Sequence, residues 1–134
     1  MLKRVQSIME EDTVSLLQYA VGPQEANIQK AIKFYGENKN AILYSYQEHG
    51  CIGIELMKEN KARICHIAVS PNSRYQGIAS VMIKKVIHMH ELIYTEAETD
   101  NDAVGFYKKC GFTITSLGEK YPGVERFHCY WAES

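Results

Sequence analysis

The segment Arg74-Tyr75-Gln76-Gly77-Ile78-Ala79 lies between a strand-like run and a helix-like run. A strand that passes through a glycine turn into a helix leaves backbone N–H groups unpaired at the helix start, where the helix dipole is positive. Gly77 has no Cβ, so a phosphate can approach the backbone closely, and Ala79 is small enough to allow the same. Arg74 adds a cationic side chain at the rim. The segment therefore predicts a site for a pyrophosphate-bearing cofactor.

The residues on either side of this turn are typical of a strand and a helix. Before it lie the apolar, β-branched run 63–69 and the turn cluster Pro71-Asn72-Ser73. After it, apolar residues recur at helical spacing from Ile78 to Ile87. The segment has neither the Gly-Lys-Ser/Thr of a P-loop nor the G-x-G-x-x-G of a dinucleotide-binding fold. On these residues alone, an ordinary strand-to-helix connection remains an alternative.

A second segment, residues 98–112, has the features of a short capped helix. Thr99 or Asp100 can cap its N-terminus, and Gly111 is placed to end it. Phe112 then resumes a strand.

Together the two segments resemble the GNAT superfamily of N-acetyltransferases. The resemblance rests on Ile67-Ala68-Val69-x-Pro71, on R-x-x-G-x-A at 74–79, and on Ala103-x-x-Phe106-Tyr107-x-x-x-Gly111-Phe112, in the family's order and at its spacing. It covers about residues 41–131, and the residues before them match only in general layout.

The fold class that we expect is α/β, with one GNAT-like domain over residues 1–134. The resemblance implies a mixed central sheet flanked by helices, and the hydrophobic pattern gives the order β-α-α-β-β-β-α-β-α-β-β. Strands are predicted at residues 2–8, 41–47, 51–57, 61–69, 92–97, 112–117 and 124–131. Helices are predicted at residues 13–20, 24–35, from 78 to about 90, and at about 101–110.

Composition narrows the classes of partner. The chain has 134 residues, 46% hydrophobic and 23% charged, with a net charge of −1. No basic run or stripe favours nucleic acid, no apolar run is long enough for a membrane span, and the start of the chain does not read as a signal peptide. The four cysteines have no framework spacing and suggest reduced thiols in a cytoplasmic protein. His88 and His90 diverge on their helix, so no metal site is expected.

The resemblance implies that acetyl-CoA is the co-substrate. Backbone amides at 76–80 would hold its pyrophosphate. The strand that contains Ile67 and Val69 would splay from its neighbour and pair with the pantetheine arm, although an ordinary paired strand is the alternative. The expected cofactor-binding residues are Ile67, Val69, Arg74, Gln76, Gly77, Ile78, Ala79, Ser80 and Phe106.

Tyr107 is the residue that we expect to take part in the chemistry. In similar proteins a tyrosine at this helix position protonates the coenzyme A thiolate as it leaves. A phenol can do so when it is held within hydrogen-bond reach. The alternative is that Tyr107 only packs beneath the cofactor.

The general base is less evident. Strand alternation places the odd-numbered residues of 63–69 on one face and His66, with the other even-numbered residues, on the opposite face. Histidine is a suitable type of base, but this alternation points His66 the wrong way, and a histidine satisfied against a helix is the alternative. In similar proteins a base on this strand lies at the positions of Arg63 or Cys65, and neither side chain suits the task. Glu96, Glu98 and Asp100 therefore become the candidate bases. Asp100 stands where the family often has asparagine, and a helix cap is its alternative role.

These observations predict an acetyl-CoA-dependent N-acetyltransferase, an acyltransferase. An acetyl group would pass to a primary amine of a small molecule or peptide. The resemblance implies that it does so by direct attack in a ternary complex, without an acyl-enzyme. The acidic residues near the helix start would suit a cationic amine. The alternatives are a non-catalytic coenzyme A-binding sensor or partner subunit, and transfer of a longer acyl group. A homodimer is left open.

Overall fold

Seven strands form one mixed sheet in the order β1-β2-β3-β4-β5-β7-β6. The computed structural model describes residues 2–5, 11–22, 24–47, 49–74 and 76–133. The elements follow in the order β1 (Leu2–Arg4), α1 (Glu11–Val21), α2 (Glu25–Glu37), β2 (Ala41–Tyr46), β3 (Gly50–Met57), β4 (Lys61–Val69), a 3-10 turn (Pro71–Ser73), α3 (Ile78–Met89), β5 (Tyr94–Thr99), α4 (Asn101–Lys109), β6 (Thr113–Tyr121) and β7 (Val124–Ala132). This order confirms the predicted fold class.

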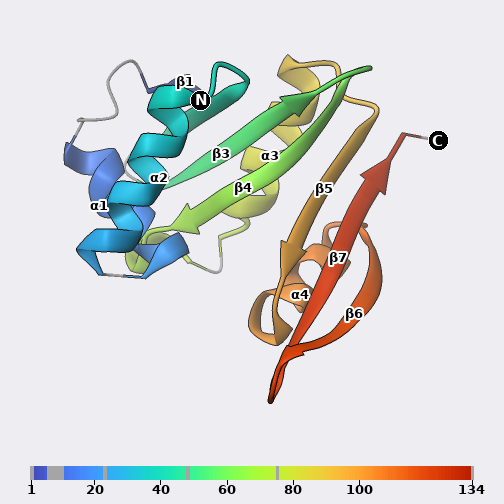
Figure 1. The fold of residues 1–134 in the computed structure, drawn as a ribbon. Coiled ribbons are helices and arrows are strands. Elements are labelled where there is room, and N and C mark those ends of the chain that lie inside the picture. Colours follow the sequence, from blue (N-terminus) through green and yellow to red (C-terminus); the bar gives the residue numbers. More distant parts are fainter. Residues whose placement is uncertain (1, 6–10, 23, 48, 75, 134) are drawn as a thin grey trace.

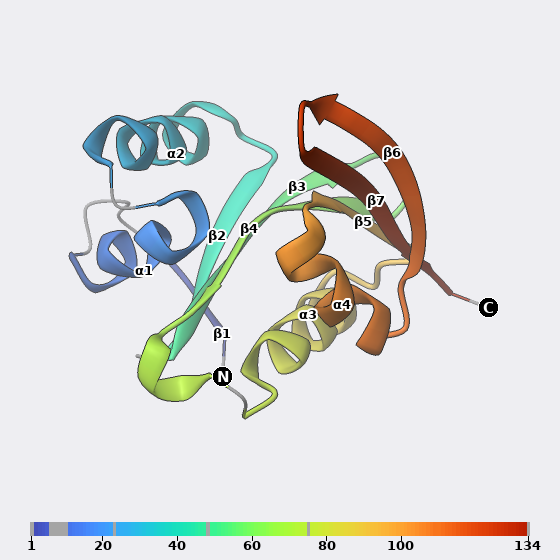
Figure 2. The ribbon, with the colours of Figure 1, turned by 90° about the horizontal axis from the view of Figure 1, so that it is seen from below.

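Two helices cover each face of the sheet. α1 and α2 pack against the face of β1 to β4, and α3 and α4 lie on the other face (Figure 2). Each layer has its own core. Leu17 and Cys51 are fully buried in the first, and Ile52, Ile54 and Met82 in the second. Alternation along the strands places their apolar residues in both cores.

The sheet opens between β4 and β5. The two strands are parallel and pair over Lys61–Arg63 with Tyr94–Glu96. Beyond Arg63 the described residues of β4 have no recorded pairing with β5, and Figure 1 shows the strands separating toward their C-terminal ends. The predicted splay is therefore present. It exposes the edge of residues 64–69 that would otherwise face β5.

A β-bulge interrupts β4. Ile64 pairs with Ile54 and His66 pairs with Gly53, so Cys65 is an extra residue without a partner in β3. An extra residue reverses the alternation beyond it. The prediction that His66 and Arg63 lie on opposite faces is therefore wrong. Their partners Gly53 and Glu55 are two residues apart on β3, so both side chains lie on the face of α1 and α2.

Some predicted boundaries were also wrong. β5 runs from Tyr94 to Thr99 rather than over 92–97, because Leu92 enters the core from the connection that precedes the strand. β6 continues to Tyr121 rather than ending at residue 117, through exposed residues that lack an apolar alternation. β1 ends at Arg4, and residues 6–8 of the first predicted strand lie outside the described residues.

Candidate active site

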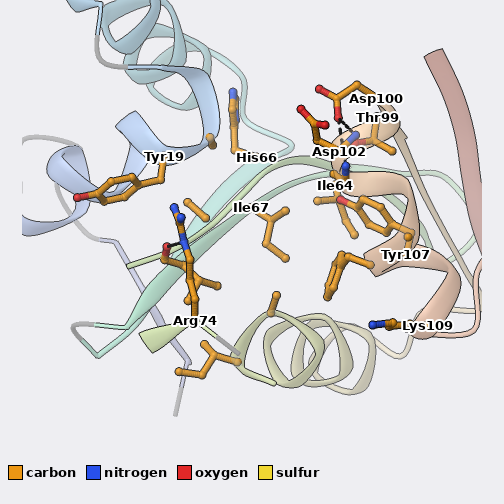
Figure 3. Close-up of a pocket in the computed structure, with 18 of the residues that line it drawn as sticks. Tyr19, Ile64, His66, Ile67, Arg74, Thr99, Asp100, Asp102, Tyr107 and Lys109 are labelled. Carbon is orange, nitrogen blue, oxygen red and sulfur yellow. Dashed lines mark hydrogen bonds between the residues drawn. The ribbon is translucent and has the colours of Figure 1, made fainter. Parts of the chain in front are cut away.

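A cleft of about 1040 Å³ lies where β4 and β5 separate. Its walls come from β4, the turn before α3, the end of β5, and α4, with α1 and β7 at the rim. Figure 3 shows Tyr107 projecting from α4 on one side and Tyr19 and Arg74 on the other. The predicted residues that line it are Ile67, Val69, Arg74, Gly77, Ile78, Ala79, Glu98, Phe106 and Tyr107.

The turn before α3 has the geometry of an anion site. Gly77 is the N-cap residue and has the left-handed backbone conformation, with φ of +73°. Apart from its chain neighbours, no atom of the described residues lies within 4 Å of the position of a Cβ at this glycine, so the space above the backbone is open to that extent. Among the described residues no side chain caps α3, so none of them gives its first N–H groups a side-chain acceptor. These features fit the pyrophosphate of a cofactor.

Neighbouring contacts hold this turn in place. The buried Ser73 hydroxyl lies 2.7 Å from Nδ1 of His49. Arg74 donates from Nε to the carbonyl oxygen of Val69 at 3.3 Å, and its guanidinium lies 5.6 Å from the centre of the Tyr19 ring. Arg74 is thereby kept at the rim of the cleft. Gln76 and Ser80 are not among the described residues that line the cleft.

Tyr107 is buried within an aromatic cluster, and only 4% of its surface is exposed. Its ring centre lies 5.1 Å from that of Phe106 and 5.3 Å from that of Phe112, edge to face in both cases. Burial, with smaller contributions from Cys129 and Cys110, raises the pKa of the phenol. The hydroxyl therefore stays protonated through the neutral range. It makes no recorded hydrogen bond to another described residue, so it is available to a ligand in the cleft.

The two carboxylates of β5 are placed differently. Glu98 lines the cleft and is held by Lys120 and Arg126, each at 3.3 Å. The hydrogen bond from Lys120 is the main cause of a lowered pKa for this carboxyl group. Glu96 is not among the described residues that line the cleft. It accepts from the Tyr94 hydroxyl at 3.0 Å and from Arg63 Nε at 3.4 Å.

Asp100 is the N-cap of α4. Its Oδ1 accepts from the backbone N–H groups of Asp102 at 3.0 Å and of Ala103 at 3.2 Å. These bonds fix the start of the helix that carries Tyr107. Of the two predicted capping residues, Asp100 is the one that caps, and Thr99 is the last residue of β5.

His66 lies at the bulge and lines the cleft. Its Nδ1 is 2.6 Å from the Tyr35 hydroxyl of α2. A Cβ at Gly53 would overlap that hydroxyl, so the glycine makes room for the pair. Burial lowers the pKa of the imidazole, which keeps it neutral at neutral pH.

Several cleft residues were not predicted. Tyr19 and Ala20 come from α1, and Arg126 comes from β7. No motif marks them, because they reach the cleft through chain segments distant from both motifs. The other lining residues without a predicted role in the site are Ile64, Ala68, Ser73, Thr99, Asp102, Ala103, Gly105 and Lys109. Cys65, His66 and Asp100, the positions at which the sequence raises the possibility of a base, also line the cleft.

Residues 34–114, more than half of the chain, match the family described as Acetyltransferase (GNAT) domain. The chain belongs to this family. The assignment predicted from the three motifs is thus confirmed, and with it the class of enzyme, an acyltransferase.

Solved structures share the fold of this GNAT domain. A putative GNAT-family acetyltransferase from Desulfovibrio desulfuricans has a TM-score of 0.78 at 14% identity, with 98% of each chain covered. An acetyltransferase from Bacillus subtilis in complex with CoA has a TM-score of 0.72 at 15% identity, covering 99% of this chain and 98% of that chain. The ribosomal-protein-S18-alanine N-acetyltransferase from Escherichia coli has a TM-score of 0.71 at 16% identity, covering 100% and 94%.

Two further observations concern partners. Among the described residues, no helix is long and apolar enough to cross a membrane. No group of three or more histidine, cysteine or acidic residues within the described part of the chain could hold a metal ion.

Proposed function

We propose that this GNAT domain transfers an acetyl group from acetyl-CoA to a primary amine. The observation that carries the proposal is the convergence, in one cleft, of an open anion-binding turn at Gly77, a free strand edge at 64–69 and the buried hydroxyl of Tyr107. Backbone amides at 76–80 would bind the pyrophosphate, and the β4 edge would pair with the pantetheine as an added strand. The CoA in the Bacillus subtilis structure supports this use of the fold.

Tyr107 is the proposed general acid. The thiolate that leaves the tetrahedral intermediate needs a proton, and a buried phenol that remains protonated can supply it when the two are within hydrogen-bond reach. Phe106 beside it would contact the cofactor as apolar packing. The cysteines of the cleft are not required, because the amine attacks the thioester directly and no acyl-enzyme forms.

The acceptor is proposed to be an amine of a small molecule or peptide. Lys120 and Arg126 compensate the charge of Glu98, so Asp100 and Asp102 at the start of α4 are the acidic groups beside the cleft that would favour a cationic amine. The Escherichia coli neighbour is a ribosomal-protein-S18-alanine N-acetyltransferase, so the fold can serve an amine of a protein. Residues 1–134 are proposed to act as one domain.

The reaction also needs a way to remove a proton from the amine. A primary alkyl amine has a pKa of about 10.4 and arrives protonated at neutral pH. Glu98 acting through water, Glu96 acting through water, and capture of the small neutral fraction of the amine are the three routes predicted from the sequence. Both carboxylates are already engaged in ion pairs, which weighs against either of them acting as the base.

An amine-panel assay tests the proposed function. Acetyl-CoA is incubated with the protein and with polyamines, amino sugars, amino acids and peptides in turn, and free thiol is measured. We expect thiol release that depends on at least one amine and equals the amount of acetylated product. Tight coenzyme A binding with no amine-dependent release would support the alternative, a non-catalytic sensor or partner subunit.

A further inference from the structure

We infer that His66 accepts the proton of the incoming amine and that Tyr35 orients its imidazole. The inference deepens the proposed function and rests on it. It is carried by three observations, namely the bulge in β4, the space left by Gly53, and the position of His66 between two cavities.

The bulge turns His66 toward the side from which an amine can approach. The imidazole projects from β4 on the side of α1 and α2, whereas Ile67 projects toward α3 (Figure 3). Tyr107 belongs to the layer of α3 and α4. The proposed acid and base therefore stand on opposite faces of the sheet and meet at the opening between β4 and β5. This separation suits a reaction in which the attacking nitrogen and the leaving sulfur are two different atoms of one intermediate.

His66 also connects the cleft with a second cavity. A groove of about 500 Å³ runs along α2, lined by Val21, Asn27, Lys30, Ala31, Phe34 and His66. His66 is the residue that this groove shares with the cleft among the described lining residues. An acceptor that enters along α2 would pass the imidazole on its way to the thioester.

Tyr35 fixes the orientation of the ring. The hydroxyl of this buried tyrosine is 2.6 Å from Nδ1. When Nδ1–H donates to the tyrosine oxygen, Nε2 keeps its lone pair and can accept a proton. The same bond persists after protonation, because both imidazolium nitrogens carry hydrogen. Tyr35 is thus a positioning residue, and Gly53 is the reason that it fits.

The proposed step balances as follows. Nε2 takes one proton from the ammonium group, and the freed lone pair of the amine nitrogen attacks the thioester carbonyl. The C–N bond forms, the C–S bond breaks, and the thiolate takes the proton of the Tyr107 hydroxyl. The Tyr107 phenolate then takes the second proton from the nitrogen and becomes a phenol again. His66 then releases its proton to water.

Other ionisable groups lie around the imidazole, and their effect on the pH dependence must be distinguished from that of His66. They are Tyr19 of α1, Lys30 and Tyr35 of α2, Cys51 and Glu55 of β3, Arg63 and Cys65 of β4, and, across the cleft, Glu98, Asp100, Asp102, Lys109 and Arg126. Burial raises the pKa of Cys51 to about 12 and of Cys65 to about 11, and it also raises that of Tyr35. None of these three titrates between about pH 5 and 7, where histidine does.

The test is the pH dependence of kcat/KM for wild type and His66→Asn. Asparagine keeps a polar atom near the position of Nδ1 and removes Nε2. For wild type, the base must be neutral, so kcat/KM should rise with pH through a pKa below 6.5, the ordinary value for histidine, and then level off in the neutral range. His66→Asn should lower kcat/KM at pH 7 on the order of 10²-fold. Its remaining rate should climb with pH toward the pKa of the amine.

The matched control is His90→Asn. His90 also pairs with a tyrosine, Tyr44, at 2.8 Å, and burial likewise lowers its pKa, but it is not among the described residues that line the cleft. This variant should keep the wild-type profile. A folded His66→Asn with wild-type rate and profile would overturn the inference. If that variant does not fold, the wild-type profile decides, since a rate that climbs with unit slope to the pKa of the amine excludes an enzyme base. Wild type without amine-dependent thiol release would instead contradict the proposed function.

Discussion

At the scale of single residues, the proposed acid is the simplest group to test. Tyr107→Phe removes one hydroxyl from a buried ring whose aromatic contacts remain. We expect kcat to fall on the order of 10²-fold with little change in coenzyme A affinity, because only the proton donor is lost. Tyr44→Phe is the control, since Tyr44 is equally buried at 4% exposure and is not among the described residues that line the cleft. If chemistry limits the rate and the Tyr107→Phe enzyme still has wild-type kcat, then Tyr107 only packs beneath the cofactor and is not the acid.

The pyrophosphate turn depends on one glycine. Gly77→Glu introduces bulk and negative charge where the open space above the backbone would receive a phosphate. We expect calorimetry to show no coenzyme A binding by the folded variant. Gly123→Glu is the matched control, because Gly123 has φ of +78°, close to the +73° of Gly77, and lies in the turn between β6 and β7. Equal affinity of the two variants would disprove the assignment of the turn.

At the scale of elements, α4 depends on its cap. Asp100→Ala removes the acceptor of two backbone N–H groups and should lower the free energy of unfolding by about 1 kcal/mol. Asp100→Asn keeps an acceptor and should stay close to wild type. Urea unfolding measures both. Because α4 carries Tyr107, we expect Asp100→Ala to lower kcat as well. An unchanged unfolding free energy for Asp100→Ala would show that water replaces the cap at no cost.

The elements also show what a sequence can and cannot predict here. The turn at Gly77 and the capped helix at 101–109 could be predicted, because their residues are local signals of backbone conformation. The bulge at Cys65 could not, since an extra residue in one strand is defined by its pairing with β3. Strict alternation therefore placed His66 and Arg63 on opposite faces, whereas they share one. Tyr19 and Arg126 reach the cleft by tertiary packing alone, so no local pattern indicates them.

At the scale of the whole molecule, two halves of the sheet meet along β4 and β5 and then part. The paired end, Lys61–Arg63 with Tyr94–Glu96, holds the halves together, and the parted end forms the cleft. We propose that acetyl-CoA occupies this opening as an added strand.

Backbone hydrogen exchange, measured with and without saturating coenzyme A, detects this added strand. We predict new protection in residues 64–69, on the amides that face the opening, and in residues 76–80 at the start of α3, because bound cofactor would accept from these N–H groups. The hairpin of β6 and β7 near Tyr121 and Gly123 should exchange at an unchanged rate, since it lies outside the cleft lining. Saturated binding without new protection at 64–69 and 76–80 would contradict the account.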